Sequence, residues 1–399
     1  MNVGLLTYHW VSNFGANLQA ISTYKYLENH GFTPIVLNWV PERLEKYYSD
    51  TVPKCQIYAH KQFNDRHFVS ITPICRDDKA IAKAIDDYKI DIVVIGSDAV
   101  FSTKPLLSRI HFGRKGLSIL KPCEDALMPN PYWASFLPYV TRPIKVVAIS
   151  ASAQNSPFKK ACFSIEKREY ERALDRFSLL TVRDIWTQRM VAYFTNNRII
   201  PNVTPDPVFA FEQNVNPGKR FFVSKALGIS EPYVMLSVSD SVSREWQIEV
   251  ETLFLEQGFV TVGMPRTTKK FTPILKHNLS FPIDPLDWYD AIKCSNGYVG
   301  ELMHPVLVSL HNSIPVYIFD TYGFKRHGTL DKSSSKTFQI AKRFGLLSNN
   351  YYNKLLSMNP PTPQEVVDAI VGFDNSHEIE VAKVMLSEFN STMKAILSV

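Results

Sequence analysis

The sequence TYHWVSNFGANLQA, residues 7–20, decides the fold of this chain. It follows a short apolar run, residues 3–6, and leads into an amphipathic segment, residues 18–27, that is closed by Gly31. A second apolar run, residues 34–39, comes next. This pattern predicts a strand, a polar loop, a helix and a second strand, which together form a βαβ unit.

The polar loop of this unit lies where open α/β sheets bind ligands, between the carboxyl end of a strand and the amino end of a helix. Free backbone N–H groups and the helix dipole favour an anion there. The loop is also crowded with hydrogen-bonding side chains, namely Thr7, Tyr8, His9, Ser12, Asn13, Asn17 and Gln19. A purely structural loop needs only one or two such groups, so we expect this loop to line a functional cleft.

Length and charge set the broad class of the protein. At 399 residues the chain is too long for one ordinary hydrophobic core, which predicts two domains. The excess of six positive charges is mild, and it suits an acidic small molecule or a glycan. A nucleic-acid partner, which usually requires a concentrated basic stripe, is not expected. The nearest approaches to such a stripe are the pairs Lys269-Lys270 and Lys325-Arg326.

Three further features bear on the cellular compartment. The first strand begins almost directly after Met1, which leaves no room for a signal peptide. No apolar run approaches the ~18 residues that a membrane span requires. The five cysteines are scattered without a C-x-x-C pair, which argues against a disulfide framework and a structural zinc site. We therefore expect a cytoplasmic protein with no membrane span and no metal site.

Strands and helices alternate along the first half of the chain. Apolar runs predict strands at 91–95, 145–150 and 179–182, and helices at 77–88, 158–176 and from about 184. An aromatic and proline-rich insert, residues 101–142, is expected to form an irregular lobe. A polar, turn-rich hinge at 212–220 then separates this half from the next.

The second half repeats the alternation. Strands are expected at 233–238, 259–264, 297–299 and 314–318, and helices at 242–257, 284–293 and 303–311. The strand at 314–318 is expected to be the last, with residues 333–399 mainly helical. We predict an α/β fold with two doubly wound lobes, residues 1–215 and 216–375, facing a central cleft. A final helix within residues 376–399 would brace the first lobe.

Two charged residues follow strands of the first half. Asp98 comes after Gly96-Ser97 at the end of a predicted strand, where glycine lets the backbone approach a ligand. Asp98 could instead cap the next helical turn. Arg183 ends another strand, where its guanidinium could clamp a carboxylate or phosphate through two parallel hydrogen bonds. The alternative for Arg183 is an ion pair with Asp184 or a nearby acid.

In the second half, Glu301 and His304 follow the strand expected at 297–299. At the first turn of a helix facing the cleft, His304 could be a general acid or base, or bind an anion. A lone histidine is more often structural, and its separation of seven residues from His311 is not a metal-ligand spacing. Arg266, with Lys269-Lys270, could add positive charge to the same cleft or remain solvated in a loop.

Several common signatures are absent from the sequence. It contains no G-x-G-x-x-G, G-x-x-x-x-G-K-[ST], G-x-S-x-G or H-E-x-x-H motif. Nicotinamide-dependent, ATP-dependent and zinc-hydrolase chemistries are therefore disfavoured.

In combination, these segments resemble the polysaccharide pyruvyl transferase family. The resemblance runs from residue 2 to about 347 and rests on motifs that arrive in the family's order. They are the TYH-x-x-x-N-[FY]-GA-x-LQA loop at 7–20, the GSD segment at 91–101, NP-[WY] at 130–132, the AS strand at 145–152, [ST]-V-R-[DE] at 181–184, the DP pair at 206–207 and the histidine motif at 301–305. Leu302 departs from the family, because some members carry arginine there, and Pro305 replaces a glycine.

The resemblance implies a two-lobed fold like that of GT-B glycosyltransferases. It also implies transfer of a pyruvyl group from phosphoenolpyruvate to two hydroxyls of one sugar, forming a cyclic ketal with no obligatory cofactor. The acceptor would be a glycan or lipid-linked oligosaccharide precursor of a polysaccharide, held by the N-terminal lobe, with the donor on the C-terminal lobe. A lipid-linked acceptor would allow peripheral membrane association; the oligomeric state is left open.

The resemblance also implies roles for the site residues. Arg183 would hold the donor's carboxylate or phosphate, His304 would exchange a proton or bind phosphate, and Asp98 would act as base on a sugar hydroxyl. The remaining substrate-binding residues would be His9, Asn13, Gly15, Asn17, Ser97, Tyr132, Trp133, Arg266 and Glu301. Among them, Tyr132 and Trp133 would stack on sugar rings.

Two rival functions remain open. One is a sugar-nucleotide-dependent glycosyltransferase of the same two-lobed build, which binding of a nucleotide sugar would favour. The other is a catalytically inactive, glycan-binding member of the family, which Leu302 and Pro305 make credible. If the missing arginine holds phosphate in the family, Arg183, Arg266 or a lysine must replace it here.

Overall fold

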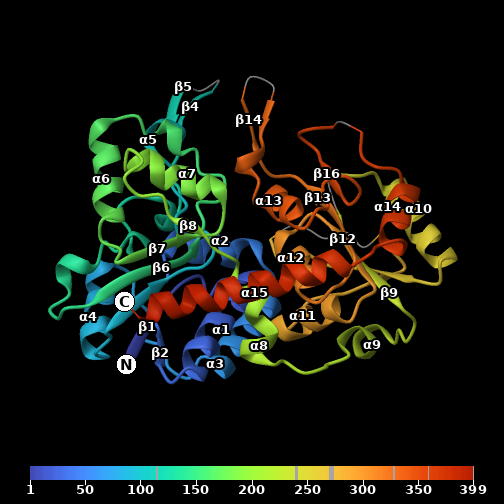
Figure 1. Cartoon of the computed structure of the whole chain (residues 1–399), viewed down its shortest axis with the longest axis horizontal. Coiled ribbons are helices and arrows are strands. Elements are labelled where there is room, and N and C mark those ends of the chain that lie inside the picture. The colour runs from blue at the N-terminus through green and yellow to red at the C-terminus, as the bar shows by residue number, and fades with distance from the viewer. Residues whose placement is uncertain (114–115, 239–240, 269–273, 327–328, 358, 399) are drawn as a thin grey trace.

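The chain folds into two α/β lobes, each built on a six-stranded parallel sheet (Figure 1). The computed structural model describes residues 1–113, 116–238, 241–268, 274–326, 329–357 and 359–398. Within these ranges no helix is both long and apolar enough to cross a bilayer. The predicted fold class, two doubly wound lobes, is confirmed by the two sheets. The lobe boundaries at 215 and 375 remain a prediction.

The first sheet has the strand order β2-β1-β3-β6-β7-β8. Its strands are β1 (Asn2–Leu6), β2 (Thr33–Val36), β3 (Ile92–Ile95), β6 (Lys145–Ala151), β7 (Leu179–Val182) and β8 (Asn202–Val203). All four residues of β3 are buried, as are all but the first residue of β6. Helices cover both faces of such a sheet, which is why its inner strands read as continuous apolar runs in the sequence.

The second sheet has the strand order β11-β10-β9-β12-β13-β16. Its strands are β9 (Tyr233–Ser237), β10 (Val260–Gly263), β11 (His277–Asn278), β12 (Gly297–Gly300), β13 (Val316–Asp320) and β16 (Tyr351–Asn353). The prediction that 314–318 is the last strand is wrong, because β16 adds a sixth strand beside β13. It has only three residues, too few for a recognisable apolar run.

The helices are α1 (Phe14–Asn29), α2 (Glu42–Thr51), α3 (Lys54–His67), α4 (Asp78–Asp87), α5 (Leu106–Arg109), α6 (Ser164–Leu174), α7 (Ile185–Phe194), α8 (Phe211–Val215), α9 (Phe222–Leu227), α10 (Arg244–Glu256), α11 (Pro285–Lys293), α12 (Met303–His311), α13 (Lys336–Arg343), α14 (Pro363–Val371) and α15 (Ser376–Leu397). Helices α2 and α3 lie in a stretch for which the sequence pattern gave no prediction. The expected irregular insert at 101–142 contains α5, short 3-10 turns and the hairpin of β4 (Ile110–Gly113) and β5 (Gly116–Ile119). A second hairpin joins β14 (Phe324–Arg326) to β15 (Thr329–Asp331).

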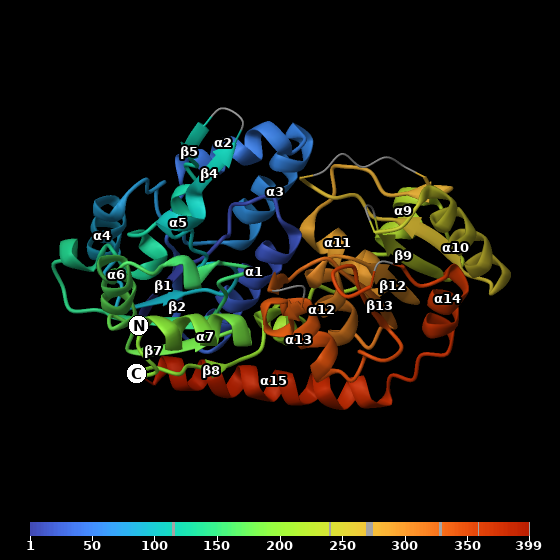
Figure 2. The same ribbon diagram turned by 90° about the horizontal axis from the view of Figure 1, so that it is seen from above.

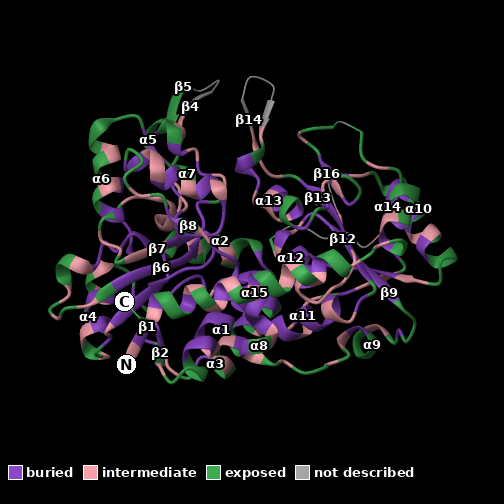
Figure 3. Cartoon of the chain, viewed as in Figure 1, coloured by how far each residue is buried: buried purple, intermediate pink, exposed green. Residues whose placement is uncertain are grey.

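Helix α1 lies between the lobes and is buried over most of its length (Figure 3). It begins four residues before the predicted helix, because the Asn13 side chain accepts a hydrogen bond from the Ala16 N–H and caps it. Phe14, at its first turn, stacks on Trp288 of α11, with ring centroids 5.1 Å apart. The first helix of one lobe thus forms part of the contact with the other.

Helices α3 and α15 make further contacts between the lobes. Gln56 of α3 is fully buried, and its side-chain amide exchanges two hydrogen bonds of 2.8 Å with the backbone of Ile283. Helix α15 runs beneath both lobes (Figure 2). It buries Met385, Phe389, Met393 and Ile396, and the Phe389 ring meets the Tyr26 ring of α1 edge-on at 5.8 Å. These contacts fix how the lobes face each other.

Candidate active site

The site lies where the strand order of each sheet reverses. In the first sheet the reversal falls between β1 and β3, and in the second between β9 and β12. The loops that follow these strands leave their sheets in opposite directions, which opens a crevice at the carboxyl ends. Asn13 and Asp98 follow β1 and β3, and His304 follows β12. The sequence motifs therefore occupy the ligand-binding edges of both sheets.

A cleft of about 560 Å³ opens between these edges. Five of the predicted site residues line it: Asn13, Gly15, Asp98, Arg266 and His304. The other lining residues are Tyr8, Val11, Phe14, Leu44, Tyr47, Tyr48, Ala99, Ser102, Asp125 and Gln154 of the first lobe, and Pro265, Thr267, Thr268, Trp288, Leu302, Met303, Pro305, Tyr322 and Lys336 of the second. Both lobes thus contribute polar groups to one space.

Two helix amino termini meet at this cleft. His304 stands in the first turn of α12, and its ring lies against Gly15 in the first turn of α1. Burial lowers the pKa of His304 to about 4, although the nearby carboxylates of Asp98 and Asp206 act in the opposite direction. The imidazole is therefore neutral near pH 7. Its Nε2 has no hydrogen-bond partner among the residues that the structure describes.

Replacing Gly15 with alanine should disturb this contact. A Cβ at Gly15 would overlap the His304 ring, so either the ring or α1 must shift. We expect the free energy of unfolding to fall by about 1–3 kcal/mol, the usual cost of overpacking. In urea unfolding, the Gly15→Ala/His304→Ala double variant should be more stable than the sum of the single variants predicts, because the clash is relieved. Additive losses would contradict a contact between these two residues.

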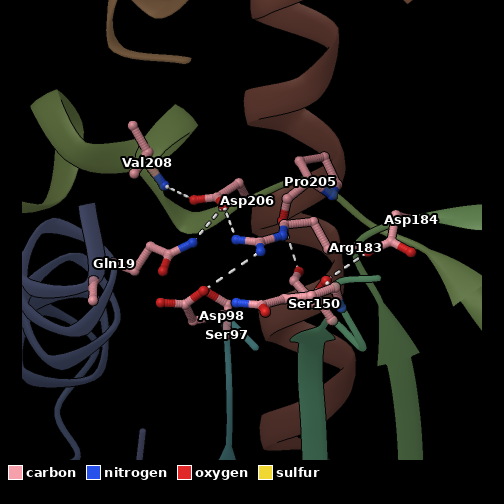
Figure 4. A network of polar contacts seen from close by, with 12 residues as sticks. Gln19, Ser97, Asp98, Ser150, Arg183, Asp184, Pro205, Asp206 and Val208 are labelled. Atoms are coloured by element: carbon pink, nitrogen blue, oxygen red, sulfur yellow. Dashed lines mark hydrogen bonds and ion pairs between the residues drawn. The ribbon is translucent and has the colours of Figure 1, made fainter. Parts of the chain in front are cut away.

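Asp98, which lines the cleft, and Arg183, which does not, belong to one buried network of polar contacts (Figure 4). Arg183 Nη1 donates a hydrogen bond of 2.6 Å to Asp206 Oδ2, and Arg183 Nη2 lies 3.6 Å from Asp98 Oδ1. Asp206 also accepts from Gln19 of α1 and from the Val208 N–H. Burial alone would raise the pKa of Asp98, but the Arg183 guanidinium, together with His304, Lys336 and the Ala99 N–H, holds the pKa below its ordinary value.

Contrary to the prediction from the sequence, Arg183 does not line the cleft. Its side chain is only 4% exposed, and its guanidinium forms ion pairs with the carboxylates of Asp206 and Asp98. Asp184 is not one of them, because it caps α7 through the Thr187 N–H and accepts a hydrogen bond from Ser152. Ser97 is also buried outside the cleft lining, where its carbonyl accepts a hydrogen bond from Thr7.

The cations of the cleft come from the second lobe. Lys336, the first residue of α13, has no hydrogen bond or ion pair to any residue in the described ranges, and its Nζ lies 5.4 Å from the Tyr322 ring centroid. Burial, reinforced by the neighbouring Arg183 charge, lowers the pKa of Lys336 to about 8. Arg266 pairs with Glu301, which is buried behind it and does not line the cleft. Lys269 and Lys270 lie outside the described residues.

Four predicted binding residues are buried away from the cleft. His9 hydrogen-bonds Asn38, and Asn17 donates from Nδ2 to the His9 carbonyl and accepts at Oδ1 from His60 Nδ1. These contacts hold the loop rather than a ligand. The expectation that Tyr132 and Trp133 stack on sugar rings is wrong, because both side chains are fully buried in the core of the first lobe. Their rings pack against neighbouring aromatic rings of the core.

Two other tyrosines line the cleft, where Tyr132 and Trp133 were expected. Tyr47 and Tyr48 of α2 line the cleft, and Tyr47 is 46% exposed. Asp125 also lines it, and its Oδ2 accepts a hydrogen bond of 2.6 Å from the Tyr8 hydroxyl. The sequence showed Tyr8 within the opening loop, but nothing local marked Asp125 or Lys336. Within the described residues, no group of His, Cys, Asp or Glu side chains could hold a metal ion.

Comparison with known families gives one match. The family model of polysaccharide pyruvyl transferases matches residues 13–322, most of the chain, including α1 and the segments that follow β3 and β12. No curated protein matches the chain significantly.

Among solved structures, the amino-terminal domain of trehalose-6-phosphate phosphatase from Candida albicans superposes with a TM-score of 0.51 and 9% identity, covering 100% of this chain and 96% of that one. The UDP-GlcNAc 2-epimerase of Neisseria meningitidis gives a TM-score of 0.48 and 10% identity, covering 98% and 100%. A spinosyn forosaminyltransferase gives 0.46 and 8%, covering 98% and 95%. At 9% identity, the similarity to the trehalose-6-phosphate phosphatase domain concerns the fold alone.

Proposed function

Because the chain belongs to the polysaccharide pyruvyl transferase family, we propose that its cleft transfers the pyruvyl group of phosphoenolpyruvate to two hydroxyls of one sugar. The product would be a cyclic ketal on a glycan or a lipid-linked oligosaccharide. Family membership supports the reaction class. The observation that carries the assignment to this cleft is Lys336, whose ammonium forms no ion pair within the described residues and lies beside His304 at the junction of two helix amino termini.

The donor would bind on the second lobe. Phosphoenolpyruvate carries a phosphate and a carboxylate, and the cleft offers it Lys336 and the exposed part of Arg266. The helix dipoles of α1 and α12 add partial positive charge at the same place. Leu302 lines the cleft where some family members carry arginine, and Lys336 supplies a cation that does not depend on that position. Arg183 acts indirectly, because it holds the Asp98 carboxylate at the cleft wall.

The reaction needs proton transfer and charge stabilisation. A proton adds to C3 of the donor, a sugar oxygen bonds to C2, the C2–O bond to phosphate breaks, and the second hydroxyl closes the ring. In balance, the two hydroxyl protons end on the new methyl group and on the released phosphate. His304, neutral in the free protein, would exchange a proton once the donor's negative charge raises its pKa.

The proposed function is tested by incubating the protein with phosphoenolpyruvate and a panel of glycans. We expect phosphate release together with the mass increment of a pyruvyl ketal on one glycan. Transfer of a sugar from a nucleotide sugar would instead identify a glycosyltransferase. Glycan binding with no consumption of phosphoenolpyruvate on any acceptor would identify an inactive member, with Leu302 and Pro305 as the first residues to revert.

Removing the charge of Lys336 should weaken donor binding. A charge-assisted hydrogen bond contributes about 1.5–3 kcal/mol, so the Kd of phosphoenolpyruvate for Lys336→Met should rise about ten- to a hundredfold. In the wild type the Kd should also rise as the pH passes 8, because the Lys336 ammonium loses its proton there. In Lys336→Met this rise of the Kd above pH 8 should be absent. Calorimetric titration from pH 6 to 9 measures both.

The exposed Lys332, four residues earlier, provides a matched control. Lys332→Met removes the same charge outside the cleft and should leave the Kd and its pH dependence unchanged. Equal affinities of the wild type and Lys336→Met would remove Lys336 from the donor site.

A further inference from the structure

We propose that Asp125, oriented by the Tyr8 hydroxyl, is the base that removes the proton from the attacking sugar hydroxyl. This inference rests on the proposed function and deepens it by naming the acceptor side of the reaction. Asp125 stands in a 3-10 turn, Glu124–Ala126, of the segment that leads from β5 to β6. It lines the cleft on the first lobe, opposite the cations of the second.

Asp125 is held in place but not neutralised. The Tyr8 hydroxyl donates to its Oδ2 at 2.6 Å, and Asp125 forms no ion pair in the part of the chain that the structure describes. The Asn130 side-chain amide donates to the Asp125 carbonyl at 3.1 Å and so fixes the turn. The N–H groups of Asp125 itself and of Ala126 also interact with the carboxylate. Because a carboxylate has about four acceptor sites and Asp125 lines the cleft, it can still accept a hydrogen bond from a hydroxyl that enters.

The orientation of Tyr8 is fixed by the buried aromatic core. Its ring centroid lies 5.0 Å from that of Tyr132, whose ring meets Trp39 edge-on at 4.6 Å. Tyr132, predicted to stack on a sugar, thus supports the residue that positions Asp125. A base whose rotamer is held by packing and by a hydrogen bond needs little reorganisation at the moment of reaction.

The two carboxylates that line the cleft lie in contrasting environments. Asp98 lies against the Arg183 guanidinium, which lowers its pKa and makes it a weak base. Among the residues that the structure describes, Asp125 has no cationic partner. Burial raises its pKa, with Glu124 acting in the same direction and Tyr8 against it. Both carboxylates line the same cleft as Tyr8 and Tyr48. Carboxylates whose environments separate their pKa values divide acid–base roles between them.

The step assigned to Asp125 is a single proton transfer. As the sugar oxygen bonds to C2 of the donor, the hydroxyl proton moves to the Asp125 carboxylate. Solvent or the departing phosphate then takes this proton, and the carboxylate is regenerated for the second hydroxyl. Tyr47, the exposed ring on the same side of the cleft, offers a face for the sugar ring.

The test compares Asp125→Asn, Tyr8→Phe and the control Glu124→Gln in the full-length protein. Glu124 is the neighbouring acid on the same turn and does not line the cleft. Ketal formation is measured from pH 4 to 9 at saturating phosphoenolpyruvate, and donor Kd is measured by calorimetry. Asp125→Asn should lower turnover by about 10² to 10⁴, the range for loss of a general base, with donor Kd unchanged. Glu124→Gln should keep the turnover and donor Kd of the wild type near neutral pH. Because the Glu124 charge raises the pKa of Asp125, the low-pH side of its pH–rate profile should move slightly to lower pH.

Tyr8→Phe gives a readout that a structural role would not produce. Because the Tyr8 hydrogen bond lowers the pKa of Asp125, its removal should move the acidic limb of the pH–rate profile to higher pH. That limb should vanish in Asp125→Asn. Turnover of Asp125→Asn within about threefold of the wild type, or an unmoved limb in Tyr8→Phe, would overturn the inference. Absence of ketal formation by the wild type would instead refute the proposed function.

Discussion

Replacing His304 with glutamine should lower the turnover of phosphoenolpyruvate by about 10² to 10⁴ while donor affinity changes only a few-fold. Glutamine fills most of the space over Gly15 and can still hydrogen-bond an anion, but it cannot exchange a proton near neutral pH. His304 is neutral in the free protein, so binding of the donor does not depend on a histidine charge. The measurement is steady-state turnover at saturating donor, with Kd from calorimetry.

His311 offers a matched control on the same helix. Burial lowers its pKa to about 4 as well, and its Nε2 also lacks a hydrogen-bond partner within the described ranges, but it does not line the cleft. His311→Gln should therefore keep normal turnover. If both variants turn over alike, His304 serves only to pack against Gly15.

Replacing Arg183 with methionine should destabilise the protein by about 3–5 kcal/mol, the cost of removing one partner from a buried ion pair. The Asp206 side chain, 1% exposed, and the Asp98 side chain, 11% exposed, would be left without their cation. Urea unfolding measures the loss. We expect activity to fall with it, because the Asp98 carboxylate at the cleft wall loses its anchor.

Two further variants separate this effect from a general loss of charge. Arg198→Met removes a cation whose pairs with Glu171 and Asp175 lie on the surface, and it should change the unfolding midpoint little. Arg183→Met/Asp206→Asn removes both partners of the shorter buried contact, so it should be more stable than Arg183→Met alone. Equal stability of Arg183→Met and the wild type would show that the buried network is dispensable.

The fold could be predicted from the sequence because its decisive signals are local. Strands such as β3 and β6 are buried on both faces, so each appears as an unbroken apolar run wherever it stands in the chain. Helix α12 occupies the predicted residues, 303–311. The structure adds α2, which buries none of its residues completely, and β16, which is only three residues long. Neither element leaves a strong apolar signature.

The sequence also predicted which segments meet, because the carboxyl ends of parallel strands share one edge of a sheet. Asn13, Gly15, Asp98 and His304 were placed at that edge by their positions after strands, and all four line the cleft. Their chemical roles remain a prediction. The sequence could predict where the backbone segments that follow the strands lie, because the hydrophobic pattern indicates where each strand ends.

Only the tertiary structure decided which side chains face the cleft and which face the core. Tyr132 is buried and Tyr47 exposed, although both stand in polar, aromatic surroundings in the sequence. Arg183 is enclosed by Asp98 and Asp206 from two distant segments. Lys336 and Asp125 reach the cleft from a helix terminus and a 3-10 turn that follow no strand of either sheet directly. Burial and charge pairing depend on which segments pack together, and such long-range contacts leave no periodic trace in the chain.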